Sequence, residues 1–592
     1  MVRPHRNRIE RGCGSVHLAP KAMAVLDCLA SAANSVVTRQ ELFDRVWPGA
    51  AISDEVLTQR IAELRKAFED SAHQSTIIET IPKMGFRLIP PVVPLSDEPV
   101  AKQGFHRAAV LPFVNMSEDP ANEYFSDGIS EELINLLVKV PGLEVISRTS
   151  SFSFKGESWK MADLVRELNA SLIVEGTVRK VDNRVRITAQ LIDPNTDRHL
   201  WSESYDRELS DIFSLQREIA QAIVTALQEE IGAHTVLGTH PTANIDAYEL
   251  LLLGRHYFYQ RGVAMDKAIK VLKMAVEEDP EFAEAWAYLA AAAVVSCYYR
   301  TSISNEHAWL IAEQAASTSL KLDPGMGLAL ASQAMLAYLH ERNLAKGFQL
   351  IDRAADEHPH DTTIRLWAGM HYWYCGYFKE ARSHFLYAHT RDPRVGITNG
   401  NLGLLYLALG LEDLAVPRLA KATELGYPNH HHALASLLMR RGDLDAAFAE
   451  LKVTLAGPGA HPDRLPWIGE LEQAGRAYMQ NPESADVLIS ILERAPEGGA
   501  TEKARLALLF DLKDPFFEYL SFSVEEGPLW LPYLVPTLWL PEYRAYVEDP
   551  RFLEIMRRDG ALEVWEHRGF PDGCIRVKAR GGDYLDWSMR YQ

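Results

Sequence analysis

The centre of this 592-residue chain carries a proline that recurs at a nearly constant interval. Five such prolines are spaced 44, 35, 34 and 35 residues apart, in the pairs Asp279-Pro280, Asp323-Pro324, His358-Pro359, Asp392-Pro393 and Tyr427-Pro428. Small residues lie 12 and 5 positions before each of the first four prolines: Ala268, Ala275, Ala312, Ser319, Gly347, Ala354, Ala381 and Ala388. Because proline ends a helix and small residues let two helices approach closely, each interval predicts one pair of antiparallel helices.

This period and this placement of small residues resemble the tetratricopeptide repeat family. We predict an all-α solenoid over residues 243–460, with five repeats and a sixth from His431 to Leu455. The first interval is longer than the others, which indicates an insertion around Tyr299–His307. The resemblance implies a curved solenoid whose concave face binds a protein or peptide partner.

Residues 1–90 predict three helices followed by a β-hairpin. Thr38, with Glu41 three residues later, forms a capping box for the second helix, and Ser53 is the expected N-cap of the third. The third helix carries one narrow apolar stripe: Leu57, Ile61, Leu64 and Phe68. Its opposite face is polar, which is the pattern of a helix that packs on a core and faces outward.

The segment resembles the OmpR/PhoB-type winged helix-turn-helix family, an α+β DNA-binding fold. The matching stretches are Val37–Leu42, Val46-Trp47, the helix Ser53–Phe68 and the hairpin Glu79–Arg87. The resemblance implies that Ser53–Asp70 is the recognition helix. It also implies that the 47–52 loop lies over phosphates or contacts RNA polymerase, and that the Lys83 corner enters the adjacent minor groove.

Nine residues are candidates for contact with double-stranded DNA: Thr38, Trp47, Gln59, Arg60, Glu63, Arg65, Lys66, Thr80 and Lys83. Gln59 can bond adenine bidentately, and Glu63 can accept a bond from cytosine N4. Arginine and lysine neutralise phosphates or reach guanine, and a lysine at a hairpin tip can enter a narrow minor groove. A helix N-terminus capped by Thr38 can hold a phosphate.

The OmpR/PhoB family has a small antiparallel sheet before its first helix. Only Arg8–Leu18 precedes that helix here, which leaves room for about one hairpin. Either the sheet is reduced, or the true start of the chain lies upstream of Met1. We favour the second explanation.

After a proline-rich linker at 91–104, residues 105–232 predict an α/β domain with helices on one side of its sheet. The domain resembles the TolB N-terminal-like family, on the stretches Val110–Phe113, Tyr124–Gly128, Val174–Val178, Arg186-Ile187 and Trp201–Glu203. The domain could bind a small ligand, pack the two ends of the chain together, or dimerise.

Four residues in this domain could be imagined as an acid/base cluster: Ser126, Asp127, Glu131 and Glu132. We favour a structural interpretation, in which Ser126 or Ser130 caps a helix and the glutamates lie near its positive end. The sequence contains no GxxxxGK[ST] and no GxGxxG, so ATP hydrolysis of the common P-loop kind is not indicated. No cofactor or metal is expected, and the Asn429–His432 run is interpreted as a solvated loop or helix start.

Residues 461–592 predict a helical C-terminal cap with degenerate repeats. The aromatic stretch Gly527–Arg544 fits either a cap over the last groove of the solenoid or a partner surface, and we favour the cap.

The formal net charge is −19, yet residues 1–90 hold 12 Lys+Arg against 10 Asp+Glu. The excess of acidic residues therefore lies outside residues 1–90. Five scattered cysteines favour a reducing compartment, and no signal peptide or membrane span is expected. We therefore predict a cytoplasmic one-component transcriptional regulator of a bacterium, binding DNA as a dimer or in tandem. The alternatives are a scaffold that does not bind DNA and a nucleotide-signalling component associated with a cyclase.

Overall fold

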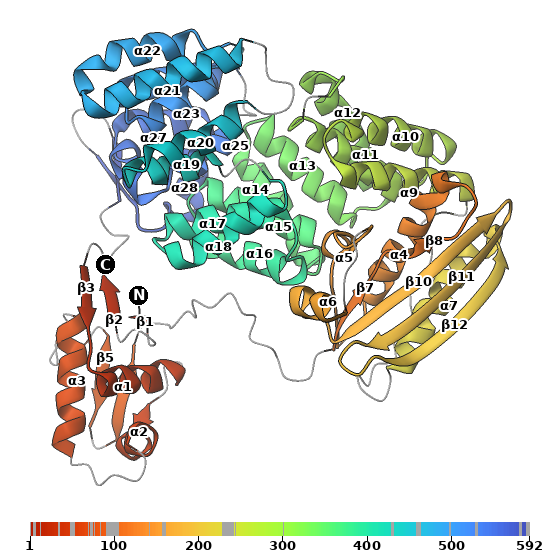
Figure 1. The fold of residues 1–592 in the computed structure, drawn as a ribbon, viewed down its shortest axis with the longest axis horizontal. Helices are drawn as coiled ribbons and strands as arrows, with labels where there is room; N and C mark the ends of the chain where they lie inside the picture. The colour runs from red at the N-terminus through yellow and green to blue at the C-terminus, as the bar shows by residue number, and fades with distance from the viewer. Residues whose placement is uncertain are drawn as a thin grey trace. The chain divides into compact units, whose positions relative to one another are not determined.

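A computed structural model gives the structure of the chain. It describes all residues except 1, 4–7, 12–13, 33–35, 48–53, 69, 71–74, 76, 83, 90–105, 141, 157–160, 228–241, 243, 300, 428–430, 457–462, 497–498, 527–530, 579–582 and 588–592. The chain divides into two compact units, Met1–Glu98 with Ser588–Gln592, and Pro99–Trp587 (Figure 1). The linker predicted at 91–104 lies outside the described residues.

The first unit contains the three predicted helices and two small sheets. The helices are α1 (Pro20–Ser31), α2 (Arg39–Val46) and α3 (Asp54–Phe68). One sheet has the strand order β4 (Val37–Thr38), β6 (Gly85–Leu88), β5 (Ile78–Ile81), and β5 and β6 form the predicted hairpin. The other sheet consists of β1 (Val2–Arg3), β2 (Arg8–Arg11) and β3 (Gly14–His17). The β2–β3 pair is the hairpin that the sequence leaves room for, and β1 adds a third short strand.

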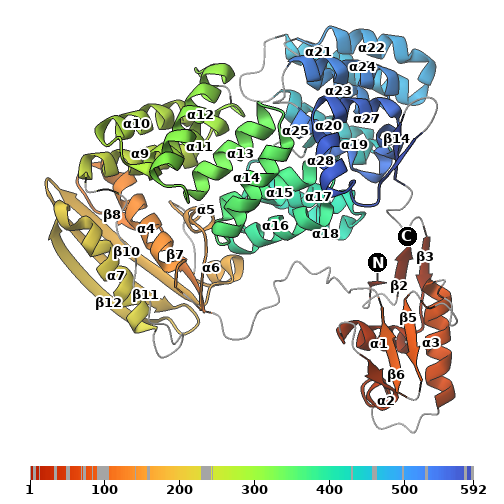
Figure 2. The ribbon, with the colours of Figure 1, turned by 180° about the vertical axis from the view of Figure 1, so that it is seen from behind.

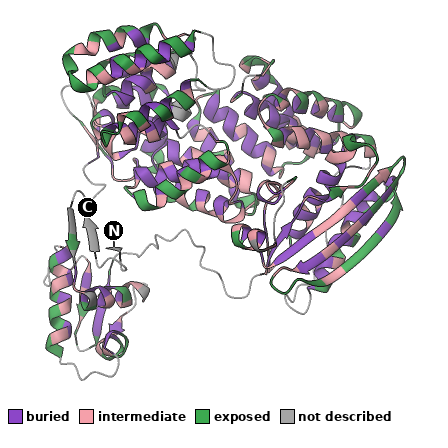
Figure 3. Cartoon of the chain, in the orientation of Figure 1, coloured by how far each residue is buried: buried purple, intermediate pink, exposed green. Residues whose placement is uncertain are grey.

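The α/β domain has one twisted sheet with the strand order β12-β11-β10-β7-β9, and β8 (Val114–Asn115) pairs with β10. The strands are β7 (His106–Val110), β9 (Leu143–Val145), β10 (Leu172–Val181), β11 (Arg184–Asp193) and β12 (Arg198–Glu208). The strands β10, β7 and β9 run parallel, whereas β10, β11 and β12 form an antiparallel meander. β12 is the exposed edge of this sheet (Figure 3).

Helices cover both faces of the parallel half of the sheet, which corrects the prediction of helices on one side. Ala109 and Ile173, which are register partners, pack with Leu164 of α6 (Met161–Leu168). The buried alternate positions of β11 point to the opposite face, where α4 (Glu123–Leu137) and α7 (Ile212–Ala226) pack on the sheet and on each other. Parallel strands need cover on both faces, because both rows of their side chains are apolar.

The solenoid contains the six predicted repeats as six helical hairpins, which follow one another in Figures 1 and 2. Their helices are α9 (Ile245–Gln260) and α10 (Ala264–Glu278), α11 (Ala283–Ser296) and α12 (Asn305–Leu322), α13 (Gly327–Leu339) and α14 (Leu344–Glu357), α15 (Thr362–Tyr374) and α16 (Phe378–Arg391), α17 (Gly396–Ala408) and α18 (Glu412–Glu424), and α19 (His431–Arg440) and α20 (Leu444–Leu455). The predicted insertion, Tyr299–His307, overlaps the long connection between α11 and α12 and extends into the first turn of α12, which begins at Asn305. Of the histidine run, Asn429 and His430 lie outside the described residues, and α19 begins at His431.

The first four proline anchors terminate the second helix of their hairpins in the same way. The amide of the residue before the proline donates to the carbonyl four residues back, as from Asp279 to Ala275 (3.0 Å) and from Asp392 to Ala388 (2.8 Å). The carbonyls that accept these bonds belong to the small residues found by their spacing, and those residues are fully buried between helices. Among the described residues, no helix is both long and apolar enough to cross a membrane.

The tail folds back onto the middle of the solenoid rather than only onto its last repeat. It contains α21 (Arg464–Gln480), α22 (Ala485–Glu493), α23 (Ala500–Leu509), α24 (Lys513–Glu526), α25 (Leu531–Leu538), α26 (Arg544–Val547), α27 (Pro550–Arg558), α28 (Ala561–Arg568) and the hairpin β13 (Ile575–Val577) and β14 (Tyr584–Asp586). Two buried indoles anchor it, because Trp539 Nε1 donates to the Tyr374 carbonyl (3.1 Å) and Trp565 Nε1 to the Cys375 carbonyl (3.0 Å).

Replacing Trp539 by alanine should destabilise the second unit by about 3–5 kcal/mol, because it removes a fully buried indole and its hydrogen bond. Thermal unfolding followed by circular dichroism measures the effect. The half-exposed Phe522 is a matched aromatic control, and Phe522→Ala should change stability by less than about 0.5 kcal/mol. Equal effects of the two substitutions would contradict the anchoring role of Trp539.

Candidate nucleic-acid interface

Helix α3 presents an exposed polar strip on the side opposite its core residues. The buried side consists of Leu57, Ile61, Leu64 and Ala67. The exposed positions are Asp54, Glu55, Thr58, Gln59, Ala62 and Lys66, and they follow one another at helical spacing. Two of the nine predicted residues, Gln59 and Lys66, lie on this strip. Thr58 was not among the nine, although the same spacing could have found it.

Arg65 fastens α3 to the hairpin. Its Nη2 donates to the Ile78 carbonyl (2.8 Å) and to Thr80 Oγ1 (2.9 Å) of β5. Just beyond the helix, Asp70 Oδ2 accepts a bond from the Ile78 amide (2.8 Å). These bonds fix the angle between α3 and the wing, which is the β5–β6 hairpin. Arg65 and Thr80 therefore have a structural role in addition to the DNA contacts predicted for them.

Glu63 and Arg60 form a second brace, on the side of α1. Glu63 Oε1 accepts a bond from the Ala19 amide (2.7 Å) at the start of α1, and Arg60 Nη1 lies 2.5 Å from Glu63 Oε2. The carboxylate therefore holds an otherwise unbonded amide of a helix N-terminus. Contact of Glu63 with cytosine and of Arg60 with phosphate stays a prediction.

The wing is joined by its backbone to the start of α2. Thr38 Oγ1 accepts a bond from the Glu41 amide (3.2 Å), and Glu41 Oε2 accepts one from the Thr38 amide (2.8 Å), which confirms the capping box. The Thr38 amide and the Thr38 hydroxyl both donate to the Glu41 carboxylate and lower the pKa of Glu41. Thr38 also pairs with Gly85 of β6, where a Cβ atom would lie 2.0 Å from the Val37 carbonyl oxygen. Only glycine permits this approach of two backbones.

Trp47 belongs to the core of the domain, with 9% of its surface exposed. Its ring centroid lies 6.3 Å from that of Phe43, and Lys21 Nζ lies 5.9 Å above it. The DNA contact predicted for Trp47 stays a prediction, and residues 48–53 of the loop that follows lie outside the described residues. Ser53 and Lys83 also lie outside them, so their predicted roles stay predictions.

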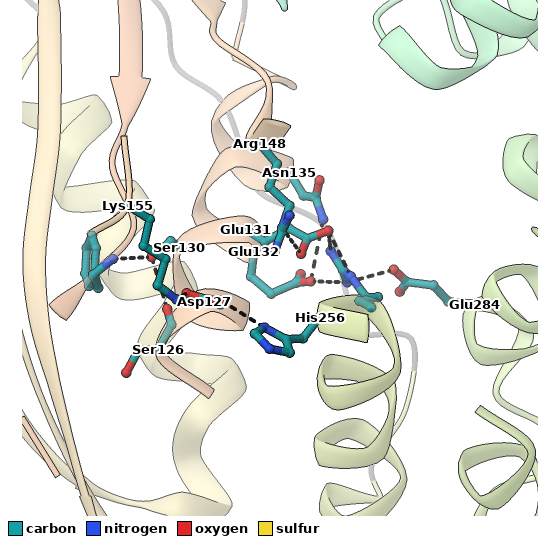
Figure 4. Close-up of polar contacts among 12 residues, drawn as sticks. Ser126, Asp127, Ser130, Glu131, Glu132, Asn135, Arg148, Lys155, His256 and Glu284 are labelled. Atoms are coloured by element: carbon teal, nitrogen blue, oxygen red, sulfur yellow. Dashed lines mark hydrogen bonds and ion pairs between the residues drawn. The ribbon is translucent and has the colours of Figure 1, made fainter. Parts of the chain in front are cut away.

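A second polar cluster joins the α/β domain to the first repeat (Figure 4). Arg255 of α9 is 1% exposed; its Nε lies 2.9 Å from Glu131 Oε1, and its Nη1 lies 2.7 Å from Glu132 Oε1 and 3.2 Å from Glu284 Oε1. Arg148 Nε lies 3.0 Å from the other oxygen of Glu131. Burial raises the pKa of Glu284 to about 7, with Arg255 opposing the rise and the neighbouring glutamates adding to it.

The neighbouring Asp127 is bound by His256 Nδ1 (3.1 Å) and by Lys155. Burial raises the pKa of Asp127, but His256 and Lys155 outweigh burial and hold it below its ordinary value. Ser126 and Ser130 lie inside α4, not at its start, so the predicted capping role is wrong. Ser130 Oγ instead accepts a bond from the Phe113 amide (2.8 Å). The cluster is an ionic joint between domains, and its acidic residues are paired with cations.

Comparison with known proteins agrees with this reading of the first unit. Residues 14–88 match the family described as "Transcriptional regulatory protein, C terminal". The transcriptional activator CadC of Escherichia coli is 36% identical over 99 residues, 17% of this chain and 19% of CadC. The match to the solved DNA-binding domain of CadC is 36% identical, and it covers 16% of this chain and 88% of that domain. Its TM-score is 0.15.

Two further relatives match other shares of the chain. The transcriptional regulator HilA of Salmonella typhimurium is 25% identical over 411 residues, 67% of this chain and 71% of HilA. A protein of Rhizobium meliloti called "Putative adenylate cyclase 3" is 44% identical over 184 residues, 31% of each chain. The chain thus spans about a third of this relative and about a fifth of CadC.

The first unit is a winged helix-turn-helix DNA-binding domain of the kind found in transcriptional regulators. It is of the OmpR/PhoB type, and in this chain it precedes an α/β domain and a solenoid of tetratricopeptide-like repeats. The resemblance of the α/β domain to the TolB N-terminal-like family stays a prediction.

Replacing Gly85 by alanine should destabilise the first unit by about 1–3 kcal/mol, because the new methyl group meets backbone that cannot move aside. The melting temperature of the first unit measures this. Gly469 of α21 is the control, since a Cβ there meets nothing within 4 Å, and Gly469→Ala should leave stability unchanged or slightly raised. An unchanged melting temperature for Gly85→Ala would contradict the close approach.

Replacing Glu284 by glutamine should flatten the pH dependence of the second unit. In the native state Glu284 holds a proton up to about pH 7 that the unfolded chain loses near pH 4.5. Its contribution to stability is therefore fully present below pH 4.5 and is lost as the pH rises to 7. Melting temperatures between pH 4.5 and 8 test this, with the exposed Glu277→Gln of α10 as the control. Parallel curves for wild type and Glu284→Gln would rule the effect out.

Proposed function

We propose that this protein is a one-component transcriptional regulator that reads double-stranded DNA with the exposed strip of α3. The observation that carries the proposal is the division of labour on that helix. Its apolar side is buried, Glu63 and Arg65 brace it against α1 and β5, and Thr58, Gln59 and Lys66 point outward. A helix of this kind fits the major groove.

Within this strip the side chains have different tasks. Gln59 has the chemistry to bond adenine, and its Oε1 is only weakly engaged by Arg60 Nη2 at 3.5 Å. Lys66 is exposed and makes no ion pair with any residue that the structure describes, so its charge is available to a phosphate. Arg60, Thr38, Thr80 and Lys83 complete the proposed contacts, on the flanks of the helix and along the wing.

The other parts of the molecule receive the signal in this proposal. The solenoid takes up a protein, a peptide or another ligand on its concave side, and the α/β domain connects it to the linker of the DNA-binding domain. RNA polymerase is a proposed partner of the loop after Trp47, and the protein acts as a dimer or on tandem sites. Because its target is DNA, we propose that it works in the cytoplasm, and we propose no enzymatic activity.

The test is binding to a duplex that the wild-type protein selects from a random pool, followed by fluorescence anisotropy at several salt concentrations. Affinity should fall steeply with salt, because each phosphate contact releases counterions. Lys66→Ala should lower the slope of log affinity against log salt by about 1. Gln59→Ala should instead change the selected sequence more than the overall affinity.

The control is Lys270→Ala, at an exposed lysine of α10 in the solenoid, which should bind DNA as the wild type does. Selection of no sequence by the wild-type protein would favour the scaffold that does not bind DNA. A Lys66→Ala variant with an unchanged salt slope would remove this residue from the interface without touching the proposal for the domain.

A further inference from the structure

The solenoid encloses a cavity of about 690 Å³ on the side lined by the first helices of its hairpins. Residues of α9, α11, α13, α15, α17 and α19 line it. Thr149 of α5 (Arg148–Phe152), in the α/β domain, and Pro536 of α25, in the tail, line it as well. The cavity therefore touches three parts of the chain, and its size is that of pockets for metabolite-sized ligands.

The wall of the cavity is rich in aromatic rings. Seven tyrosine and tryptophan rings come from five successive repeats: Tyr259, Tyr298, Tyr299, Tyr338, Trp367, Trp373 and Tyr427. Aromatic rings bury large flat surfaces and favour stacked or edge-on contact with another ring. A planar ring is thus the shape that this wall accommodates with most contact.

The charged residues of the wall carry an excess of positive charge. Three arginines line the cavity, Arg261, Arg394 and Arg505, against one carboxylate, Asp392. Arg394 already pairs with Glu167 of α6. Burial raises the pKa of Asp392 although the side chains of Ser147 and Ser150 oppose the rise, so this carboxylate gives up its charge more readily than an exposed one.

Arg261 is the cation that lacks a compensating charge. No carboxylate pairs with it among the described residues, and its Nη1 is shielded from solvent without a hydrogen-bond partner. Its guanidinium lies 4.1 Å from the centre of the Phe258 ring. A shielded charge without a partner is costly, and burial accordingly lowers the pKa of Arg261.

The backbone at Arg261 is also strained. Its φ is 60° and its ψ is −168°. Residues other than glycine rarely adopt this backbone conformation, which costs about 1–3 kcal/mol. Gly262 follows with a φ of 58°. The chain thus turns sharply after α9 and sets an arginine, in an unfavourable conformation, at the edge of the cavity. Strained backbone persists only where the surrounding structure holds it in place, and such positions cluster at ligand-binding and active sites.

We propose that this cavity binds a planar aromatic anion of metabolite size, with its carboxylate or phosphate group on Arg261 and its ring among the aromatic residues of the wall. The proposal deepens the signal-receiving role given above to the solenoid, and in that respect it rests on the proposed function. It favours a small molecule over a peptide laid along the concave face, because α5 and α25 line the same cavity as the repeats.

The ligand would also connect the domains. Thr149 belongs to the α/β domain and neighbours Arg148, which pairs with Glu131 of the ionic joint. On the other side, α25 packs against α15 and α23. An occupant in contact with both ends would stabilise the second unit as one body, since a ligand that binds only the folded state shifts unfolding by mass action.

The experiment titrates the full-length protein with 8-anilino-1-naphthalenesulfonate, a fluorescent aromatic anion, and with the uncharged N-phenyl-1-naphthylamine. The wild type should bind the anion at one saturable site and show a raised melting temperature. Arg261→Gln should weaken binding of the anion roughly tenfold or more and leave binding of the neutral probe unchanged, because only the charge-assisted bonds are lost. Arg261→Lys, which keeps the charge, should retain most of the affinity.

Two variants separate the cavity from the rest of the surface. Met370→Trp, at a residue of α15 that lines the cavity, should weaken binding of both probes by narrowing the cavity. Arg353→Gln removes an exposed arginine of α14 that pairs with Glu357 outside the cavity, and it should bind both probes as the wild type does. Circular dichroism verifies that each variant is folded.

Displacement of the bound probe by 1-naphthoate or by 1-naphthyl phosphate then identifies the preferred anionic group. Unchanged anion binding by Arg261→Gln, or unchanged binding of both probes by Met370→Trp, would overturn the proposal. None of these measurements involves DNA, so their failure leaves the proposed function of the DNA-binding domain standing, and failure to bind DNA leaves the cavity proposal standing.

Discussion

The second unit depends on the ionic contacts of Arg255 across the joint between the α/β domain and the solenoid. Removing a guanidinium from water is costly, and the cost is offset only because Glu131, Glu132 and Glu284 converge on it from two helices. The same joint brings α4 so close to α9 that a Cβ on Gly128 would meet the Leu252 side chain. The α/β domain and the solenoid, which are separate in the sequence, are therefore in direct contact. The acidic residues of α4 form ion pairs across that contact.

In the DNA-binding domain, too, charged side chains hold elements of the structure together. Residues that look like readers of DNA in the sequence turn out to have structural contacts as well, Glu63 with the start of α1 and Arg65 with β5. A recognition helix works only if its angle to the wing is fixed, because base contacts tolerate little displacement. The exposed strip and the bonds of Glu63 and Arg65 therefore work together. These bonds hold α3 at the angle at which its outward side chains can reach the bases.

The repeats were predictable because their signals are local. A proline after the second helix, with small residues 5 and 12 positions before it, defines the first four hairpins, and the capping box at Thr38 is equally local. The predicted caps at Ser126 and Ser130 failed for the opposite reason. The helix begins at Glu123, and the partner of its glutamates, Arg255, lies more than a hundred residues away in the chain. The cover on both faces of the sheet likewise depends on how α6 crosses it.

The number of repeats and the outward side of α3 could be predicted from the sequence alone, since periodicity and capping act over a few residues. The type of the DNA-binding domain was predicted from its resemblance to a known family. Three features could be recognised only in the tertiary structure: Trp47 is a core residue, the tail returns to the middle of the solenoid, and Arg261 lies beside an aromatic cavity with no carboxylate paired to it among the residues that the structure describes. Those facts arise from contacts between distant segments, and a burial or an unpaired charge exists only once such segments have met.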